Sequence, residues 1–192
     1  MLQRFGSGGP WESAYGYSRA VRCGDFVLVA GTTAVSEDGV VLAPGDAAGQ
    51  VDAILDAIER ALTAAGARLQ HVVQTRMYVT DIGRADEIGR AHGARFGEAP
   101  PVTAMVQVAA LLDPRMLVEI EAALALAGAR LDQVVRTRMF VTDMSRAEEI
   151  GRAHGERFAD HPPASTLVAV AALIDPRMLV EIEAVAYLGA PV

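Results

Sequence analysis

VQVAALLDPRMLVEIEA, residues 106–122, returns almost unchanged as VAVAALIDPRMLVEIEA at residues 168–184. Each copy is predicted to form two short strands around an Asp-Pro-Arg turn. Pro114 and Pro176 support the turn, because proline cannot donate a hydrogen bond to a sheet and suits the corner of a turn.

The second strand of the first copy alternates between apolar and acidic residues. Val118, Ile120 and Ala122 would lie on one face, and Glu119 and Glu121 on the other. A strand with so acidic a face cannot be buried on both sides unless something is bound there.

The repeated stretch belongs to a larger duplication. When residues 61–122 are laid over residues 123–184 without a gap, 43 of 62 positions are identical. Nothing before Ala61 has a second copy. The chain is therefore expected to contain a complete domain at 1–122 and a duplicated C-terminal half-domain at 123–192.

An alternative arrangement joins residues 1–61 to residues 123–192 and treats the first copy as an insertion. In either arrangement one half-domain is left with an exposed apolar sheet face and unpaired strand edges. We expect that half to pack on a neighbouring subunit or on another spare half.

Composition limits the function classes. Of 192 residues, 52% are hydrophobic and 21% charged, which is typical of a globular protein. Apolar runs stay short of a membrane span and the first residues do not resemble a signal peptide, so a cytoplasmic protein is expected. Cys23 is the single cysteine, which leaves no disulfide or thiolate metal cluster to propose. The net charge of −7 argues against nucleic acid as a partner.

The unduplicated part is predicted to begin with a loose glycine-rich segment at residues 1–11. Strands are expected at 17–21, 26–30 and 40–42. A helix should follow from an N-cap at Asp46 to about Ala65, because apolar residues recur there at helical spacing.

The duplicated part is predicted to open with a strand from Val72 to Thr80. Asp81 should cap a second helix whose inner stripe holds Ile88, His92 and Phe96. Too few residues follow Ala122 to encode a second long helix, so the two copies would share one.

Several short motifs together carry a family likeness. They are Tyr17-Ser18 at the start of a strand, Val29-Ala30-Gly31 at the end of the next, a Val-Val-x-Thr strand ending in Thr-Asp, and Val-x-Val-Ala-Ala-Leu followed by Val-Glu-Ile-Glu-Ala. In this set of motifs the chain resembles the Rid family, also called YjgF/YER057c/UK114.

The resemblance implies a chorismate-mutase-like α+β fold, with a mixed β-sheet and two helices on one face. It also implies a homotrimer with ligand clefts between subunits. Well-known members hydrolyse enamines and imines such as 2-aminoacrylate to a carbonyl compound and ammonia, with no metal or organic cofactor.

The chain departs from the family pattern at a substrate-binding position. Family deaminases hold the substrate carboxylate with an Arg in a Pro-Ala-Arg motif, where this chain has Thr103 and Ser165. A hydroxyl cannot replace the paired charge-assisted hydrogen bonds of a guanidinium. A non-catalytic protein that binds a small metabolite is therefore the alternative function.

Arg76 and Arg138 lie in mid-strand, on the same predicted face as Glu119. One interpretation is a structural Arg–Glu pair across the sheet. The other is that the arginine replaces the missing family arginine and holds an anionic ligand.

Glu119 and Glu181 match family site positions and are the candidates for positioning or activating a water molecule. Tyr17 is a third candidate catalytic contact. Candidate ligand contacts are Thr32, Thr103 and Ser165. His92 and His154 are expected to be hydrogen-bonded core or interface residues, since no second metal ligand lies at helical spacing from either.

Overall fold

The computed structural model describes residues 2–24, 26–124 and 131–186, in two compact units, Met1–Ala125 and Leu126–Val192. Each unit is described on its own. None of the described helices is both long and apolar enough to cross a bilayer.

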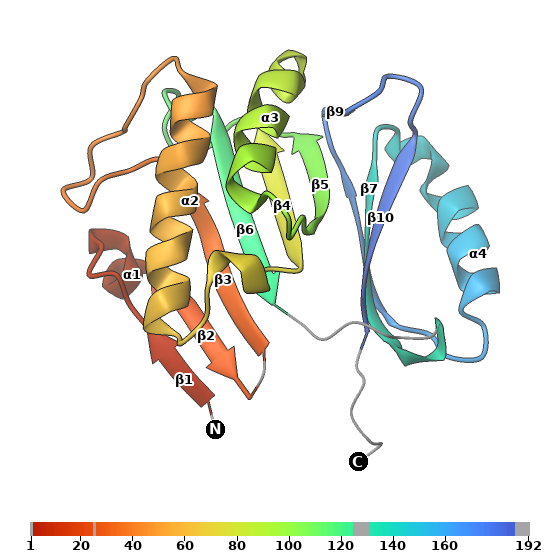
Figure 1. The fold of residues 1–192 in the computed structure, drawn as a ribbon. Helices are drawn as coiled ribbons and strands as arrows, with labels where there is room; N and C mark the ends of the chain where they lie inside the picture. The colour runs from red at the N-terminus through yellow and green to blue at the C-terminus, as the bar shows by residue number, and fades with distance from the viewer. Residues whose placement is uncertain (1, 25, 125–130, 187–192) are drawn as a thin grey trace. The chain divides into compact units, whose positions relative to one another are not determined.

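The first unit is a mixed sheet with helices packed on one face (Figure 1). Its strands lie in the order β1-β2-β3-β6-β4-β5, and each neighbouring pair is antiparallel except β4 and β5, which are parallel. The strands are β1 (Leu2–Phe5), β2 (Ala20–Cys23), β3 (Phe26–Thr33), β4 (Gln74–Val79), β5 (Val102–Gln107) and β6 (Val118–Leu124). The helices are α1 (Pro10–Tyr15), α2 (Ala47–Ala64) and α3 (Ala85–Phe96).

Helix α2 has the bounds that its sequence predicts. The side chain of Asp46 accepts a hydrogen bond from the backbone nitrogen of Gly49, which caps the helix N-terminus. After the last turn Gly66 adopts a left-handed conformation with φ of 75°, which glycine adopts at little cost.

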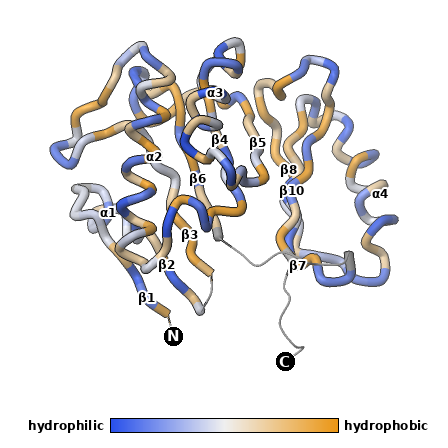
Figure 2. Tube along the Cα trace, viewed as in Figure 1, coloured by the Kyte–Doolittle hydropathy of each residue, from blue (hydrophilic) through white to orange (hydrophobic). Residues whose placement is uncertain are grey.

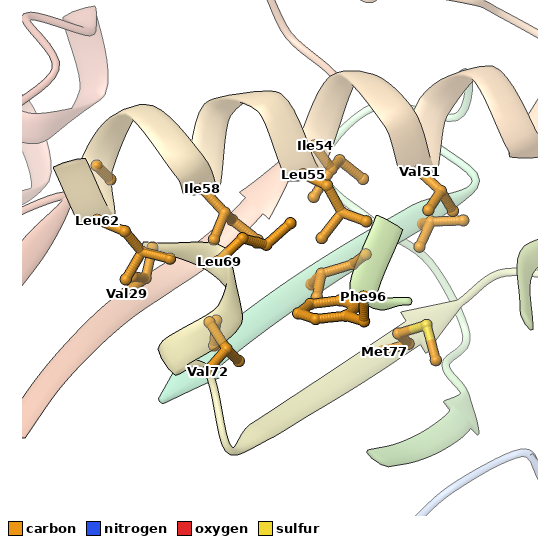
Figure 3. Close-up of a cluster of buried hydrophobic side chains, with 14 of the residues drawn as sticks. Val29, Val51, Ile54, Leu55, Ile58, Leu62, Leu69, Val72, Met77 and Phe96 are labelled. Atoms are coloured by element: carbon orange, nitrogen blue, oxygen red, sulfur yellow. The ribbon is translucent and has the colours of Figure 1, made fainter. Parts of the chain in front are cut away.

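The core lies between α2 and the sheet. Figure 3 shows apolar side chains of α2 directed at residues of β3, β4 and α3. The large apolar side chains that are fully buried on α2 are Val51, Ile54, Leu55, Ile58 and Leu62. Hydrophobic residues alternate with hydrophilic ones along this helix (Figure 2), as expected of a helix with one buried face.

Helix α3 begins later than predicted. The Asp81 carboxylate accepts from the backbone nitrogen of Gly83 and caps a single 3-10 turn, Ile82–Arg84, after which α3 starts. The predicted stripe of Ile88, His92 and Phe96 is buried, which confirms that this face packs on the core.

An irregularity in the pairing of β3 with β6 sits beside the pocket described below. Val29 pairs with Ala122, whereas Thr32 pairs with Ile120, so two residues of β3 stand opposite the single residue Glu121. This β-bulge at Ala30 and Gly31 re-aims the end of β3.

The second unit repeats the β-α-β-β order of the duplicated segment. It contains β7 (Val134–Val141), α4 (Ala147–Arg157), β8 (Ala164–Ala169), β9 (Ala172–Leu173) and β10 (Val180–Ala186). Within the unit the strand order is β10-β7-β8, antiparallel and then parallel, like β6-β4-β5 of the first unit.

Several predicted elements were wrong. Residues 40–42 form no strand, and Val41 makes an isolated bridge to Val35. The described part of residues 1–11, from Leu2 on, is not loose, because β1 pairs with β2 and α1 begins at Pro10. The first predicted strand starts at Ala20 rather than Tyr17.

The Asp-Pro-Arg turn does not join two neighbouring strands. Strands β5 and β6 lie on opposite sides of β4, so the segment between them crosses over β4. Alternation and a proline locate a strand and a turn, but they do not say which strands pair.

Candidate functional site

A pocket of about 440 Å³ opens in the first unit where β3 runs beyond the end of β2. The segment around α1 forms an aromatic wall, α2 contributes a small-residue wall, and the end of β3 contributes polar residues. The aromatic lining residues are Phe5, Trp11, Tyr15 and Tyr17, and the polar ones include Arg19, Thr32, Thr33, Ser36, Arg60 and Glu119. Of the residues predicted to bind or act on a ligand, the pocket thus brings together Tyr17, Thr32 and Glu119.

Glu119 is one of two acidic residues that line this pocket, the other being Glu37. It lies on β6 opposite Thr33 of β3, and its carboxyl group lies against the α-carbon of Gly31, where a side chain would collide with it. Burial raises the pKa of Glu119, and the neighbouring charge of Glu121 raises it further, while the positive charge of Arg19 opposes both effects. The site therefore holds a carboxyl group that exchanges its proton at higher pH than an ordinary glutamate.

Arg19 contacts residues on two sides of the pocket, Tyr17 on one and the end of β3 on the other. Its Nη1 donates to the carbonyl oxygen of Gly31 at 3.1 Å and lies 3.2 Å from Oγ1 of Thr32, and its Nη2 lies 3.0 Å from the hydroxyl oxygen of Tyr17. Its guanidinium carbon lies 5.4 Å from the centre of the Tyr17 ring. Arg19 thus holds Tyr17 and Thr32 in fixed positions beside Glu119.

Glu12 of α1 holds the N-terminal segment near Arg19. Its carboxylate lies 3.5 Å from Nε of Arg19 and accepts hydrogen bonds from the backbone nitrogen and the hydroxyl of Ser7. Burial raises the pKa of Glu12, but the Ser7 hydrogen bonds and the Arg19 charge outweigh it, so the pKa falls below its usual range. An ionised Glu12 therefore offsets the charge of Arg19.

Arg76 does not line the pocket. It stands opposite Glu121 on the neighbouring strand, and Nη1 of Arg76 forms an ion pair with Oε2 of Glu121. The hydroxyl of Tyr78 lies 3.4 Å from the same carboxylate oxygen. This geometry is the cross-sheet Arg–Glu pair of the structural interpretation, and the anion-binding role of Arg76 stays a prediction.

Thr103 belongs to a separate hydrogen-bond network on the helix side of the sheet. Oγ1 of Thr75 lies 2.9 Å from Nε2 of His92 and 2.9 Å from Oγ1 of Thr103. Burial lowers the pKa of His92, which favours the neutral imidazole. His92 is thus the hydrogen-bonded core histidine that was predicted, and Thr103 is the exposed end of this hydrogen-bond network.

The second unit reproduces this hydrogen-bond network. Oγ1 of Thr137 lies 2.9 Å from Nε2 of His154 and 2.8 Å from Oγ of Ser165. Glu181 stands opposite Phe140, and Arg138 stands opposite Glu183. Tyr17, Arg19 and Gly31 precede the duplicated segment, so Glu181 has no copies of these neighbours.

Arg19 was not predicted from the sequence, although a signal was present. It lies two residues after Tyr17, at the spacing that puts two extended residues on one face, and it is the charged residue of an otherwise uncharged YSRAV run. Within the described residues no group of three or more His, Cys, Asp or Glu side chains is placed to hold a metal ion.

Comparison with known proteins identifies the family. The family model described as Endoribonuclease L-PSP matches residues 10–125 and, a second time, residues 120–188. The chain belongs to this family. The solved structures similar to this chain include members of the YjgF/YER057c/UK114 group, the Rid proteins. The resemblance seen in the sequence motifs is therefore confirmed.

A solved Rid-family structure, Rv2704 of Mycobacterium tuberculosis, is 48% identical and superposes with a TM-score of 0.59, covering 66% of this chain and 100% of that one. An uncharacterized protein of Streptomyces coelicolor is 36% identical over 62% of this chain and 89% of its own length. The 3-aminoacrylate deaminase RutC of Acinetobacter baylyi is 31% identical over 54% of this chain and 82% of its own. The Rv2704 structure, from the YjgF/YER057c/UK114 family, confirms the predicted α+β fold.

Proposed function

We propose that this Rid-family chain hydrolyses small enamine or imine metabolites to a carbonyl compound and ammonia. The observation that carries the proposal is the half-buried carboxyl group of Glu119, with its raised pKa, in a pocket shared with Tyr17, Arg19 and Thr32. The similarity to a protein named as a 3-aminoacrylate deaminase supports the same reaction class.

A carboxyl group of this kind suits both halves of the reaction. In its protonated form Glu119 gives a proton to the enamine carbon, which yields the protonated imine. As a carboxylate it takes a proton from water while the water oxygen bonds to the imine carbon, and it then gives that proton to the nitrogen of the carbinolamine. As ammonia leaves and the carbonyl forms, the hydroxyl proton passes to Glu119, which restores its protonated form. A raised pKa keeps both forms accessible nearer neutral pH.

Tyr17 and Thr32 are proposed to orient the substrate. Arg19 holds both through its guanidinium, so their hydroxyl groups are positioned before a ligand arrives. Positioning of this kind lowers the entropic cost of reaching the reactive geometry.

A carboxylate on the substrate needs a cation, because Thr103 stands where family deaminases have arginine. Arg60 lines the pocket from α2, is exposed, and makes no recorded hydrogen bond or ion pair with the described residues. We propose Arg60 as this anchor ahead of Arg76, whose guanidinium is buried and pairs with Glu121.

The alternative function is non-catalytic binding of a small metabolite. It is favoured by Thr103 and Ser165, whose neutral hydroxyl groups cannot replace a guanidinium and are hydrogen-bonded to Thr75 and Thr137. In either case we expect a homo-oligomer, a trimer by family resemblance, and sedimentation equilibrium will give its mass.

The test is ammonia release from 2-aminoacrylate that a serine dehydratase generates in the same cuvette. We expect the wild-type chain to accelerate release, Glu119→Gln to abolish the acceleration, and Arg60→Ala to weaken substrate binding. Glu181→Gln is the matched control, because it changes the same residue of the second copy, and it should retain activity. If the wild-type chain gives no acceleration while pyruvate, the carbonyl product of 2-aminoacrylate, still binds, the binding function replaces the deaminase.

A further inference from the structure

The apolar face of the duplicated half-domain can be compared with an identical face whose covering is known. In the first unit α2 packs on β6 and the segment before it, and Met116, Val118 and Ile120 are 2%, 0% and 0% exposed. The corresponding residues of the second unit, Met178, Val180 and Ile182, are 45%, 38% and 50% exposed. The same three side chains are thus buried in one copy and open to solvent in the other.

The helices show the same difference. Ile88 and Phe96 of α3 are buried, whereas their equivalents, Ile150 of α4 and Phe158 directly after it, are only half-buried. The cause lies in the sequence, since the duplicated segment starts after most of α2 and supplies no second copy of that helix. The second unit therefore presents a one-sided apolar surface made by β10 and the inner edge of α4, here called the open face.

We infer that the open face is an interface between two copies of the chain, with one second unit packed against the other about a two-fold axis. Each chain supplies one α2 and two faces that α2 fits. If chains exchanged their α2 helices, each α2 would still cover only one face. One open face per chain would remain, and no additional apolar area would be buried. Pairing of two open faces buries both at once.

The chemistry of the open face suits such a self-contact. Along β10 the residues that point to this side are Val180, Ile182 and Ala184, whereas the glutamates of the strand point to the other side. The polar pair on this side, Thr137 and His154, is already joined by a hydrogen bond. A two-fold contact puts each apolar residue against an equivalent surface, and no unpaired carboxylate of β10 is buried.

Single-cysteine crosslinking tests the inference directly. In a Cys23→Ser background, Ile182→Cys places a thiol on the open face, and Val168→Cys places one on the opposite face of the same sheet, where Val168 pairs with Phe140. Mild oxidation should convert most of the Ile182→Cys chain to a covalent dimer and leave the Val168→Cys chain mainly uncrosslinked. Equal crosslinking of the two variants would overturn the inference.

Three further variants exclude other occupants. Ile182→Glu should halve the mass seen in sedimentation while the far-ultraviolet spectrum is retained, and Val168→Glu should leave the mass unchanged; an unchanged mass for Ile182→Glu contradicts the pairing. An Ala48→Cys, Glu149→Cys double variant reports on exchange of α2, because Ala48 contacts Glu87, the equivalent of Glu149, in the first copy. A disulfide between chains in that variant would show that α2 of another chain covers the open face, and would refute pairing of the second units.

Discussion

The carboxyl group of Glu119 occupies the space in which a side chain at Gly31 would begin. The two residues face each other across the β3–β6 pair at the bulge, so the absence of a β-carbon at one position sets the place of the acid at the other. Gly31 therefore shapes the pocket by its lack of a side chain, although it contributes no polar side-chain group.

Gly31→Ala is expected to push Glu119 out of its position and to destabilise the fold by about 2 kcal/mol, the usual scale of a forced overpacking. In a Glu119→Ala background the same substitution should cost less than about 0.5 kcal/mol, because the colliding atoms are gone. Urea denaturation of the two single variants and the double variant completes the cycle. Equal costs in both backgrounds would show that the collision is not what excludes alanine.

Glu119→Gln is expected to change the pH dependence of stability. Burial first, and the charge of Glu121 second, raise the pKa of Glu119 in the folded state, so the folded chain binds more protons than the unfolded chain in the interval between the two pKa values. The free energy of unfolding therefore falls as pH rises through that interval. The Gln variant should lose this fall, as measured by denaturation at a series of pH values, and a wild-type curve that rises there would contradict the assigned shift.

Arg19→Gln is expected to move the same transition to still higher pH, since the positive charge of Arg19 lowers the pKa of Glu119. It should also weaken ligand binding, because Tyr17 and Thr32 lose the group that holds them. Arg22→Gln is the control, since Arg22 hydrogen-bonds the backbone of Gly24 and Ala65 away from Glu119. A transition that stays in place in Arg19→Gln would rule out the coupling of the two charges.

Gln50→Leu is expected to destabilise the first unit by at least about 2 kcal/mol, because buried backbone groups that lose a partner cost about 1–3 kcal/mol each. Gln50 is fully buried; its Nε2 donates to the carbonyl oxygen of Arg115 at 2.7 Å, and its Oε1 accepts from the backbone nitrogen of Leu117 at 2.7 Å. Thermal unfolding of Gln50→Leu and of the exposed control Gln70→Leu measures the difference. A loss in Gln50→Leu no larger than in the control would show that these bonds contribute little.

Local signals in the sequence predicted local structure well. The cap at Asp46 and the buried stripe of α3 each depend on residues within a few positions of one another, and both are present. The strand predicted at residues 40–42 failed because β-forming residues need a partner strand, and Val41 finds only a single bridge.

The pocket was predicted in part. Tyr17, Thr32 and Glu119 converge, but Arg19 and the wall from the N-terminal segment depend on contacts between residues far apart in the chain. The bulge that brings Gly31 to Glu119 is a register shift between two strands, and no pattern within one strand encodes it. Arg76 lies on the predicted strand face, yet its place in the sheet directs it to Glu121.

The pairing of β3 with β6 also bears on how the chain folds. Val118 to Ala122 of β6 is identical to Val180 to Ala184 of β10, so an unfolded chain offers β3 two equivalent partners. During synthesis the first copy emerges about 3–12 s before the second, at elongation rates of about 5–20 residues per second, and β6 has that interval to pair without competition. Refolding from denaturant presents both copies to β3 at the same time. Synthesis from the N-terminus therefore favours the first copy as the one that completes the domain.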